Sequence, residues 1–178
     1  MTVLLAALVL IPERGRSVLI VPMGGASKPT ISRVVAALRA RYAMDFEVMA
    51  PIAMPENAYY PPRKRWRAEK LLVRLSKRPA WRVMGVADKD ISTTLHGHPD
   101  WGIMGLADCP GRSCVVSSFR AKQGVGCVAI HELGHTLGLP HCATKTCIMR
   151  DAEGTGRIAK SKGDFCQRCA GTIRQWLR

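Results

Sequence analysis

The chain has 178 residues, of which 47% are hydrophobic, a composition typical of globular proteins and unlike that of disordered chains. Its length fits one domain, alone or with a small appended lobe, and is sufficient for a buried core. There are 27 lysines and arginines against 13 acidic residues, a formal charge of +14. This charge would attract nucleic acid or acidic proteins, but no familiar nucleic-acid-binding pattern is present. We therefore favour a dispersed basic surface without a nucleic acid partner.

Residues 1–16 form an apolar N-terminal extension ahead of the first predicted strand. The apolar run is shorter than the ~20 residues that a membrane-spanning helix needs. It also lacks the basic start and the small-residue cleavage site of a signal peptide. A disposable leader and an extra strand are both compatible with this run, and we expect no membrane partner.

Strands and helices alternate along the first half of the chain. Apolar, β-branched runs bounded by turn residues predict strands over 17–21, 46–50, 81–86, 101–107 and 114–119, with a short extended segment over 91–95. Helical spacing predicts helices from residue 28 to about 42 with Thr30 as the cap, and over 64–77, 126–137 and 171–177. Proline-rich residues 51–62 are expected to form a loop, and the basic run 63–67 to open the second helix as a solvated face.

The alternation of strands and helices predicts an α/β fold with a mostly parallel sheet. The connection between 101–107 and 114–119 is short enough for an antiparallel pair. We expect the first of these two strands to lie at the edge of the sheet.

The most informative stretch is His131-Glu132-Leu-Gly-His135, within the predicted helix 126–137. Residues four apart lie on one face of a helix, so both imidazoles can reach one metal ion. Glu132 is then close enough to take a proton from a zinc-bound water, which zinc has acidified. Such a string also occurs by chance in helices, with surface or core histidines. Two ligands hold an ion incompletely, so a third ligand is required.

Leu137-Gly138-Leu-Pro-His141 supplies the third ligand. Glycine adopts the left-handed conformation that ends a helix, which lets the chain turn and bring His141 back to the ion. Three protein ligands with one open position are typical of catalytic zinc. The complete eleven-residue pattern is far less expected by chance than the first five residues alone.

This pattern, followed by Met149, resembles the signature of the metzincin clan of metallopeptidases. The resemblance implies that Met149 forms a tight turn beneath the metal without binding it. A core methionine would pack in nearly the same way.

Four of the seven cysteines follow the histidines: Cys142, Cys147, Cys166 and Cys169. This grouping suggests thiolates that hold a metal in a reducing compartment. The run from His131 to Cys169 resembles the archaemetzincins, and weaker resemblance extends upstream to Val18. The resemblance implies a second, structural zinc on the four cysteines, which would form a closed tetrahedral site. Two disulfides or free buried thiols are the alternatives.

The remaining cysteines and two histidines lie outside these patterns. We expect Cys127 to be a small core residue and Cys109 and Cys114 to be free thiols, although their spacing around a turn would permit a disulfide. His96 and His98 are expected to be surface residues.

Together these features predict a metzincin-like catalytic domain with a twisted, mostly parallel mixed sheet, an active-site helix and a small C-terminal lobe bound to zinc. The extension 1–16 precedes the domain 17–178, in which 17–138 carry the sheet and active-site helix and 139–178 the lobe. We expect a monomeric, cytoplasmic zinc metallopeptidase with two zinc ions per chain that acts on peptides or proteins. The alternative is a catalytically silent, zinc-stabilised basic module that binds nucleic acid or acidic proteins, and the intact Glu132 argues against it.

Overall fold

The computed structural model describes residues 16–95, 97–152 and 154–176. The nine strands of this part are β1 Ser17–Met23, β2 Asp45–Val48, β3 Tyr59–Tyr60, β4 Arg65–Arg67, β5 Arg82–Ala87, β6 Ile91–Leu95, β7 His98–Ile103, β8 Gly105–Ala107 and β9 Ser113–Ser117. The α-helices are α1 Lys28–Arg39, α2 Ala68–Ser76, α3 Ser118–Ala121, α4 Val125–Thr136 and α5 Gln167–Trp176. Short 3-10 turns occur over Glu56–Ala58, Pro61–Arg63, Lys122–Gly124 and Ile158–Lys160.

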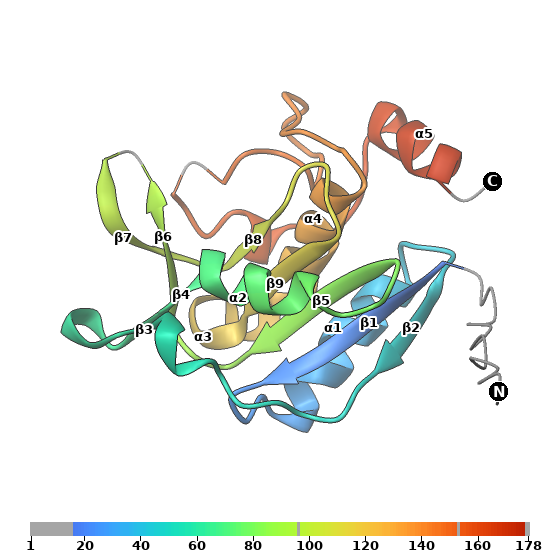
Figure 1. Ribbon diagram of the computed structural model, residues 1–178. Coiled ribbons are helices and arrows are strands. Elements are labelled where there is room, and N and C mark those ends of the chain that lie inside the picture. Colours follow the sequence, from blue (N-terminus) through green and yellow to red (C-terminus); the bar gives the residue numbers. More distant parts are fainter. Residues whose placement is uncertain (1–15, 96, 153, 177–178) are drawn as a thin grey trace, which may run out of the picture.

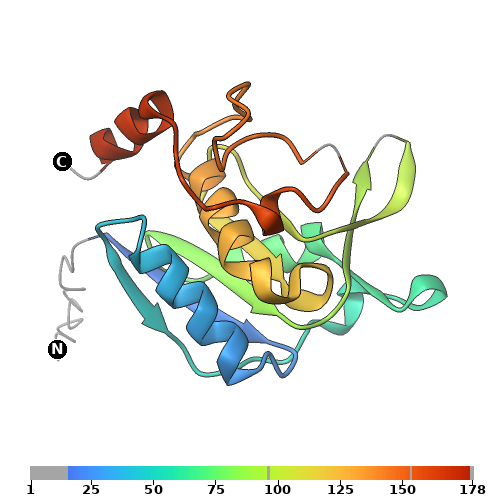
Figure 2. The ribbon, with the colours of Figure 1, turned by 180° about the vertical axis from the view of Figure 1, so that it is seen from behind.

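The main sheet has five strands in the order β2-β1-β5-β9-β8. The first three pairs are parallel, and β8 pairs antiparallel with β9 at the edge. Figure 1 shows α2 in front of this sheet, and Figure 2 shows α1 and α4 over its other face. The predicted α/β class, the mostly parallel sheet and the antiparallel edge pair are therefore confirmed.

Alternating side chains of the central strands bury both faces of the main sheet, as expected for strands with helices on both sides. Val18 and Ile20 of β1 pack in the cluster with α1 and α4. Val21 and Met23 pack in the cluster with α2. Helix α4, which carries the predicted histidine ligands, is thus held against the main sheet.

The contact between α1 and α4 depends on Gly126. A Cβ at Gly126 would lie 2.6 Å from the Cβ of Ala37, so a side chain there would force the two helices apart. We expect Gly126→Ala to lower the free energy of unfolding by about 1–3 kcal/mol, the usual effect of overpacking. Urea denaturation measures this change.

The matched control for this prediction is Gly171→Ala in α5. A Cβ at Gly171 would meet only the distal Nη2 of Arg174, at 3.9 Å. Because alanine is the better helix former by about 1 kcal/mol, this control should be neutral or stabilising. Equal effects of the two substitutions would contradict the close packing of α1 on α4.

A second, four-stranded sheet in the order β3-β4-β6-β7 was not predicted. Trp66 in β4 pairs in parallel with Ile91 in β6, and β6 and β7 form an antiparallel hairpin that projects from the main sheet in Figure 1. The prediction of one strand over 101–107 was wrong, because the chain passes from one sheet to the other at Met104.

The predicted helix 64–77 begins later, at Ala68, because residues 65–67 form β4. The basic run is therefore not a solvated helix entry. Arg65 is only 17% exposed and forms ion pairs with Asp90 and Asp100.

Other element ends also differ from the predictions. The cap of α1 is Ser27, whose Oγ accepts a hydrogen bond from the amide of Thr30, so Thr30 lies inside the helix. The last strand ends at Ser117, whose Oγ accepts from the amide of Phe119 and caps α3. Helix α5 begins at Gln167 and is longer than predicted.

The described residues contain no helix that is long and apolar enough to cross a membrane. The predicted N-terminal extension lies outside the described residues, apart from its last position. The boundary between 17–138 and 139–178 stays a prediction.

Candidate active site

Helix α4 places two histidines on one face. Its buried side packs on the main sheet and α1, and the buried Tyr42 hydroxyl donates to the carbonyl oxygen of Ile130 at 2.7 Å. This bond fixes the helix one residue before His131. The rings of His131 and His135 lie 4.5 Å apart between centroids, as the spacing of four residues predicts.

Gly138 turns the chain at the end of α4 with φ of +82°, the left-handed conformation predicted for this glycine. The turn brings the ring of His141 to 5.5 Å from that of His131 and 4.9 Å from that of His135. One ligand atom from each histidine lies within 4.8 Å of the other two. The structure therefore brings the three predicted ligands together.

The outer ring nitrogens of the histidines are held by oxygen atoms. Nδ1 of His131 lies 2.7 Å from the carbonyl oxygen of Ile148, and Nδ1 of His135 lies 2.7 Å from that of Leu139. A carbonyl oxygen only accepts, so each Nδ1 carries the proton and each Nε2 presents a lone pair. Nδ1 of the more exposed His141 lies 3.2 Å from Asp151.

The two Nε2 atoms of His131 and His135 lie 3.0 Å apart. Burial lowers the pKa of His131 to about 4 and also lowers that of His135, so neither ring is expected to be protonated at neutral pH. Two facing lone pairs repel unless a cation lies near both. Fixed tautomers with outward hydrogen bonds are typical of metal-bound histidines, and the three residues fit a zinc ion.

Glu132 points into a cleft beside the histidines. The residue is 8% exposed, and burial raises the pKa of its carboxyl to about 8; a nearby cation opposes this effect because it favours the charged form. A Cβ at Gly105 of β8 would lie 2.6 Å from Cγ and Oε1 of Glu132. The edge strand therefore packs directly on the carboxylate, and only glycine leaves room for it.

The cleft has a volume of about 550 Å³. Its walls come from β6, β7, β8, α3, α4 and the chain that follows His141. Its lining is mainly apolar and includes Trp101, Ile103, Met104, Val128 and Ile158. A cleft with apolar walls and few polar groups is the usual form of a substrate-binding site.

Met149 is fully buried beneath α4. A Cβ at Gly134 would lie 2.6 Å from its sulfur, so the absence of a side chain at 134 lets the methionine approach the helix. The carbonyl oxygen of Met149 accepts from the amide of Cys142 at 2.8 Å. The residue packs between the helix and the chain that follows His141, and its role as a turn beneath a metal stays a prediction.

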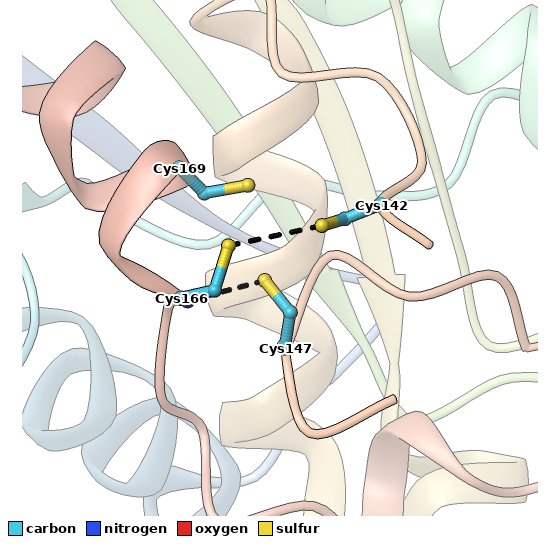
Figure 3. A group of neighbouring side chains, drawn as sticks. All are labelled: Cys142, Cys147, Cys166 and Cys169. Atoms are coloured by element: carbon cyan, nitrogen blue, oxygen red, sulfur yellow. Dashed lines mark hydrogen bonds between the residues drawn. The ribbon is translucent and has the colours of Figure 1, made fainter. Parts of the chain in front are cut away.

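The four predicted cysteines form a second group (Figure 3). Their sulfur atoms all lie within 4.8 Å of one another, and those of Cys142 and Cys166 are 3.8 Å apart. A tetrahedral zinc site with bonds of about 2.3 Å requires sulfur atoms about 3.8 Å apart, whereas a disulfide requires about 2 Å. All seven cysteines are free, and the four thiols fit a zinc ion.

Nearby donors favour the thiolate form of Cys142 and Cys166, whereas burial raises the pKa of Cys147 and Cys169. The amide of Thr144 lowers the pKa of Cys142 to about 6, and Nη2 of Arg168 donates to the same sulfur at 3.4 Å. The amide of Cys166 donates to the sulfur of Cys147 at 3.4 Å. Zinc binds the thiolate and not the thiol.

The two groups are linked through the chain. Cys142 directly follows His141, and Cys147 directly precedes Ile148, whose carbonyl oxygen holds His131. The loop 142–147 is therefore fixed at both ends next to parts of the histidine site.

The other cysteines and His98 belong to neither ligand group, although Cys109 lines the cleft and its thiol donates to the carbonyl oxygen of Leu139 at 3.6 Å. Cys109 is exposed and Cys114 is buried, and both are free thiols, as predicted; Cys127, which was predicted to be a core residue, is half-buried and packs against the core. His98 is exposed and stacks on Trp101; His96 lies outside the described residues.

Among the lining residues that were not predicted site residues, Gly105, Arg120 and Asp151 lie against Glu132, Asp90 and His141 respectively. An isolated glycine within a strand signals the close approach of another group, so Gly105 carried a usable signal. Arg120 and Asp151 carried no such signal in the sequence. The partners of Arg120 lie far away in the sequence, and Asp151 lies at the end of an irregular loop.

Comparison with known proteins agrees with this geometry. A model of Peptidase family M54 matches residues 122–175. The archaemetzincin of Methanopyrus kandleri is 31% identical over 135 residues, which cover 70% of this chain and 75% of that protein. Its crystal structure has a TM-score of 0.77 at 27% identity and covers 94% of this chain and 99% of that chain.

A second solved structure supports the fold alone. The archaemetzincin of Archaeoglobus fulgidus, complexed with malonate, has a TM-score of 0.76 at 24% identity and covers 88% of this chain and 99% of that chain. Because the family match spans the active-site helix and the cysteines, and because the M. kandleri relative is similar over most of its length, this chain belongs to the archaemetzincins, Peptidase family M54, and is a zinc metallopeptidase.

Proposed function

We propose that the cleft hydrolyses peptide bonds with one catalytic zinc ion on His131, His135 and His141 and with Glu132 as the general base. The observation that carries this proposal is the convergence of three oriented imidazoles beside a buried carboxylate in one cleft. Zinc in this position supplies acidification of a water molecule and polarisation of the scissile carbonyl.

The chain's own residues perform the proton transfers. Glu132 takes a proton from the attacking water and later delivers it to the leaving amine. The contact with Gly105 limits the movement of this carboxylate and holds it next to the edge strand. Cys142, Cys147, Cys166 and Cys169 hold a second, structural zinc in the same proposal.

Strand β8 is placed to align an extended substrate. It is the edge of the main sheet, and all three of its residues line the cleft. A peptide that adds to this edge would be held by backbone hydrogen bonds. Of the predicted edge strand 101–107, only residues 105–107 lie at the edge of the main sheet and could take this role.

The alternative of a basic binding module gains no support from the basic run 63–67. Arg65 and Arg67 of this run form ion pairs with Asp90, Asp100 and Glu69. Their charges are therefore partly compensated within the protein.

A peptidase assay with a mixture of peptides tests the proposal on the wild type and on Gly105→Ala. The added Cβ displaces the Glu132 carboxylate, so we expect kcat/KM to fall about tenfold to a hundredfold, as for small misplacements of a reacting group. Zinc content and melting temperature should stay unchanged. Liquid chromatography with mass spectrometry measures the products.

Gly156→Ala is the matched control, because this glycine also lines the cleft and a Cβ there would have no neighbour within 4 Å. Its activity should equal that of the wild type. Cleavage of no peptide by zinc-loaded wild type would contradict the proposed function. Full activity of Gly105→Ala would contradict the assignment of Glu132 as the general base.

A further inference from the structure

Arg120 of α3 lines the cleft and is held in a fixed orientation. Its Nε and Nη2 atoms each donate to a carboxylate oxygen of Asp90 at 2.7 Å. This two-bond contact fixes the plane of the guanidinium. The third nitrogen, Nη1, has no partner among the described residues and is available for another acceptor.

Asp90 forms ion pairs with more than one arginine. It also pairs with Arg65 at 2.9 Å, and Arg65 pairs with Asp100 at 3.0 Å. The four charges sum to zero, so this network orients Arg120 without adding net negative charge to the cleft. Asp90 and Asp100 are 12% and 9% exposed, which protects the network from solvent screening.

Gly102 of β7 makes room for the guanidinium. A Cβ at this position would lie 2.5 Å from Cζ and Nη2 of Arg120. The arginine therefore lies directly against the backbone of the strand that forms the cleft wall. This is the same device by which Gly105 admits Glu132.

Among the described residues that line the cleft, Arg120 is the single lysine or arginine. The lining acids are Glu132, assigned to catalysis, and Asp151, which pairs with His141. Many of the other walls are apolar, including Trp101, and an apolar setting strengthens a charged hydrogen bond. A cationic donor set in such walls is suited to an anionic acceptor on the substrate.

We propose that Arg120 is a specificity-determining residue that binds a carboxylate of the peptide substrate. This inference rests on the proposed function of the cleft. The carboxylate belongs either to an acidic side chain or to the chain terminus of the substrate, since both present the same two oxygens.

The structure limits where this carboxylate lies. Gly102 and Gly105 are three residues apart, so their Cα atoms are separated by at most about 10 Å. Arg120 contacts the first position and Glu132 contacts the second. An extended substrate along this wall therefore carries the recognised carboxylate within about three residues of the scissile bond.

The first experiment measures binding without turnover, in zinc-loaded Glu132→Gln protein. Fluorescence anisotropy compares labelled peptides that contain glutamate or glutamine at each of three positions on either side of the cleaved bond. A second pair carries a free or an amidated C-terminus. We expect one carboxylate peptide to bind about tenfold to a hundredfold more tightly than its amide partner, as for a hydrogen bond to a charged group.

The same comparison in Glu132→Gln/Arg120→Gln should abolish this preference. Glu132→Gln/Arg74→Gln is the matched control, because it removes the same charge from the exposed side of α2 and should keep the preference. The glutamate and terminal pairs distinguish the two sources of the carboxylate. Equal binding of every pair, or a preference that survives Arg120→Gln, would overturn the proposal.

Gly102→Ala provides a second variant in case Arg120→Gln does not fold. It displaces the guanidinium while keeping its charge, and should also lower the preference. The wild type is assayed in parallel for cleavage of the same peptides. Preferential binding without any cleavage would refute the proposed hydrolysis and leave carboxylate recognition standing, whereas cleavage without preference would refute only the role of Arg120.

Discussion

Glu132→Gln is expected to lower kcat by a hundredfold to ten-thousandfold, the usual contribution of a general base, by order of magnitude. Glutamine has nearly the same shape, so it fills the space beside Gly105, but it takes no proton from water. The three histidines are unchanged, and zinc content should stay at the wild-type value. Peptide cleavage and metal analysis on the same preparation measure both quantities.

Glu47→Gln is the control for this prediction. Glu47 lies on the exposed outer strand β2, and its substitution removes the same charge as Glu132→Gln. Its kcat should match that of the wild type. Wild-type turnover by Glu132→Gln would show that another group activates the water. Loss of zinc from this variant would mean that Glu132 also supports the metal site.

The double substitution Cys166→Ser/Cys169→Ser is expected to reduce the zinc content from about two ions per chain to one or fewer. We also expect the melting temperature to fall by at least about 10 °C. A structural zinc site contributes several kcal/mol, and about 1 kcal/mol corresponds to 2–4 °C in a domain of this size. Metal analysis and thermal unfolding measure the two effects.

The same double variant should weaken zinc binding at the histidines by about tenfold to a hundredfold, the usual effect of losing support around metal ligands. The reason is the loop 142–147, which begins beside His141 and ends beside the Ile148 carbonyl that holds His131. Competition with a chromophoric chelator measures this affinity. Cys127→Ser is the control, because the serine hydroxyl keeps a donor for the Ser161 carbonyl. If the double variant retained two zinc ions per chain, the four-cysteine site would be excluded.

The histidine group was predictable because its geometry is local. Spacing of four residues on a helix aligns His131 with His135, and a glycine at 138 turns the chain toward His141. The cysteine group was predictable from resemblance and ligand chemistry, although its members are up to 27 residues apart. Whether both groups hold zinc in this chain is tested by the experiments above.

The second sheet was not predictable from local pattern. Residues 64–77 have helical periodicity, and Arg65 and Arg67 look like members of a solvated helix face. The environment of Arg65 is instead set by Asp90 and Asp100, which lie 25 and 35 residues further along the chain. Long-range ion pairs of this kind override a weak local preference.

The positions of Gly102 and Gly105 also show what cannot be predicted from the sequence. A glycine in a predicted strand signals that something lies close to the backbone, but the sequence does not say which group it is. In one case it is Arg120 and in the other Glu132. Only the folded chain assigns the two partners.

The order of these features along the chain has a consequence for biosynthesis. The last strand of the main sheet ends at Ser117, whereas both candidate metal groups lie between His131 and Cys169. A protein emerges from the ribosome with its N-terminal part first. Every strand of the sheet is therefore made before any proposed ligand; the histidine group is complete at His141, and the cysteine group is complete only at Cys169, when nearly the whole described chain has been synthesised. The structural zinc proposed for the four cysteines can therefore act only on a chain whose main sheet and active-site helix have already been made.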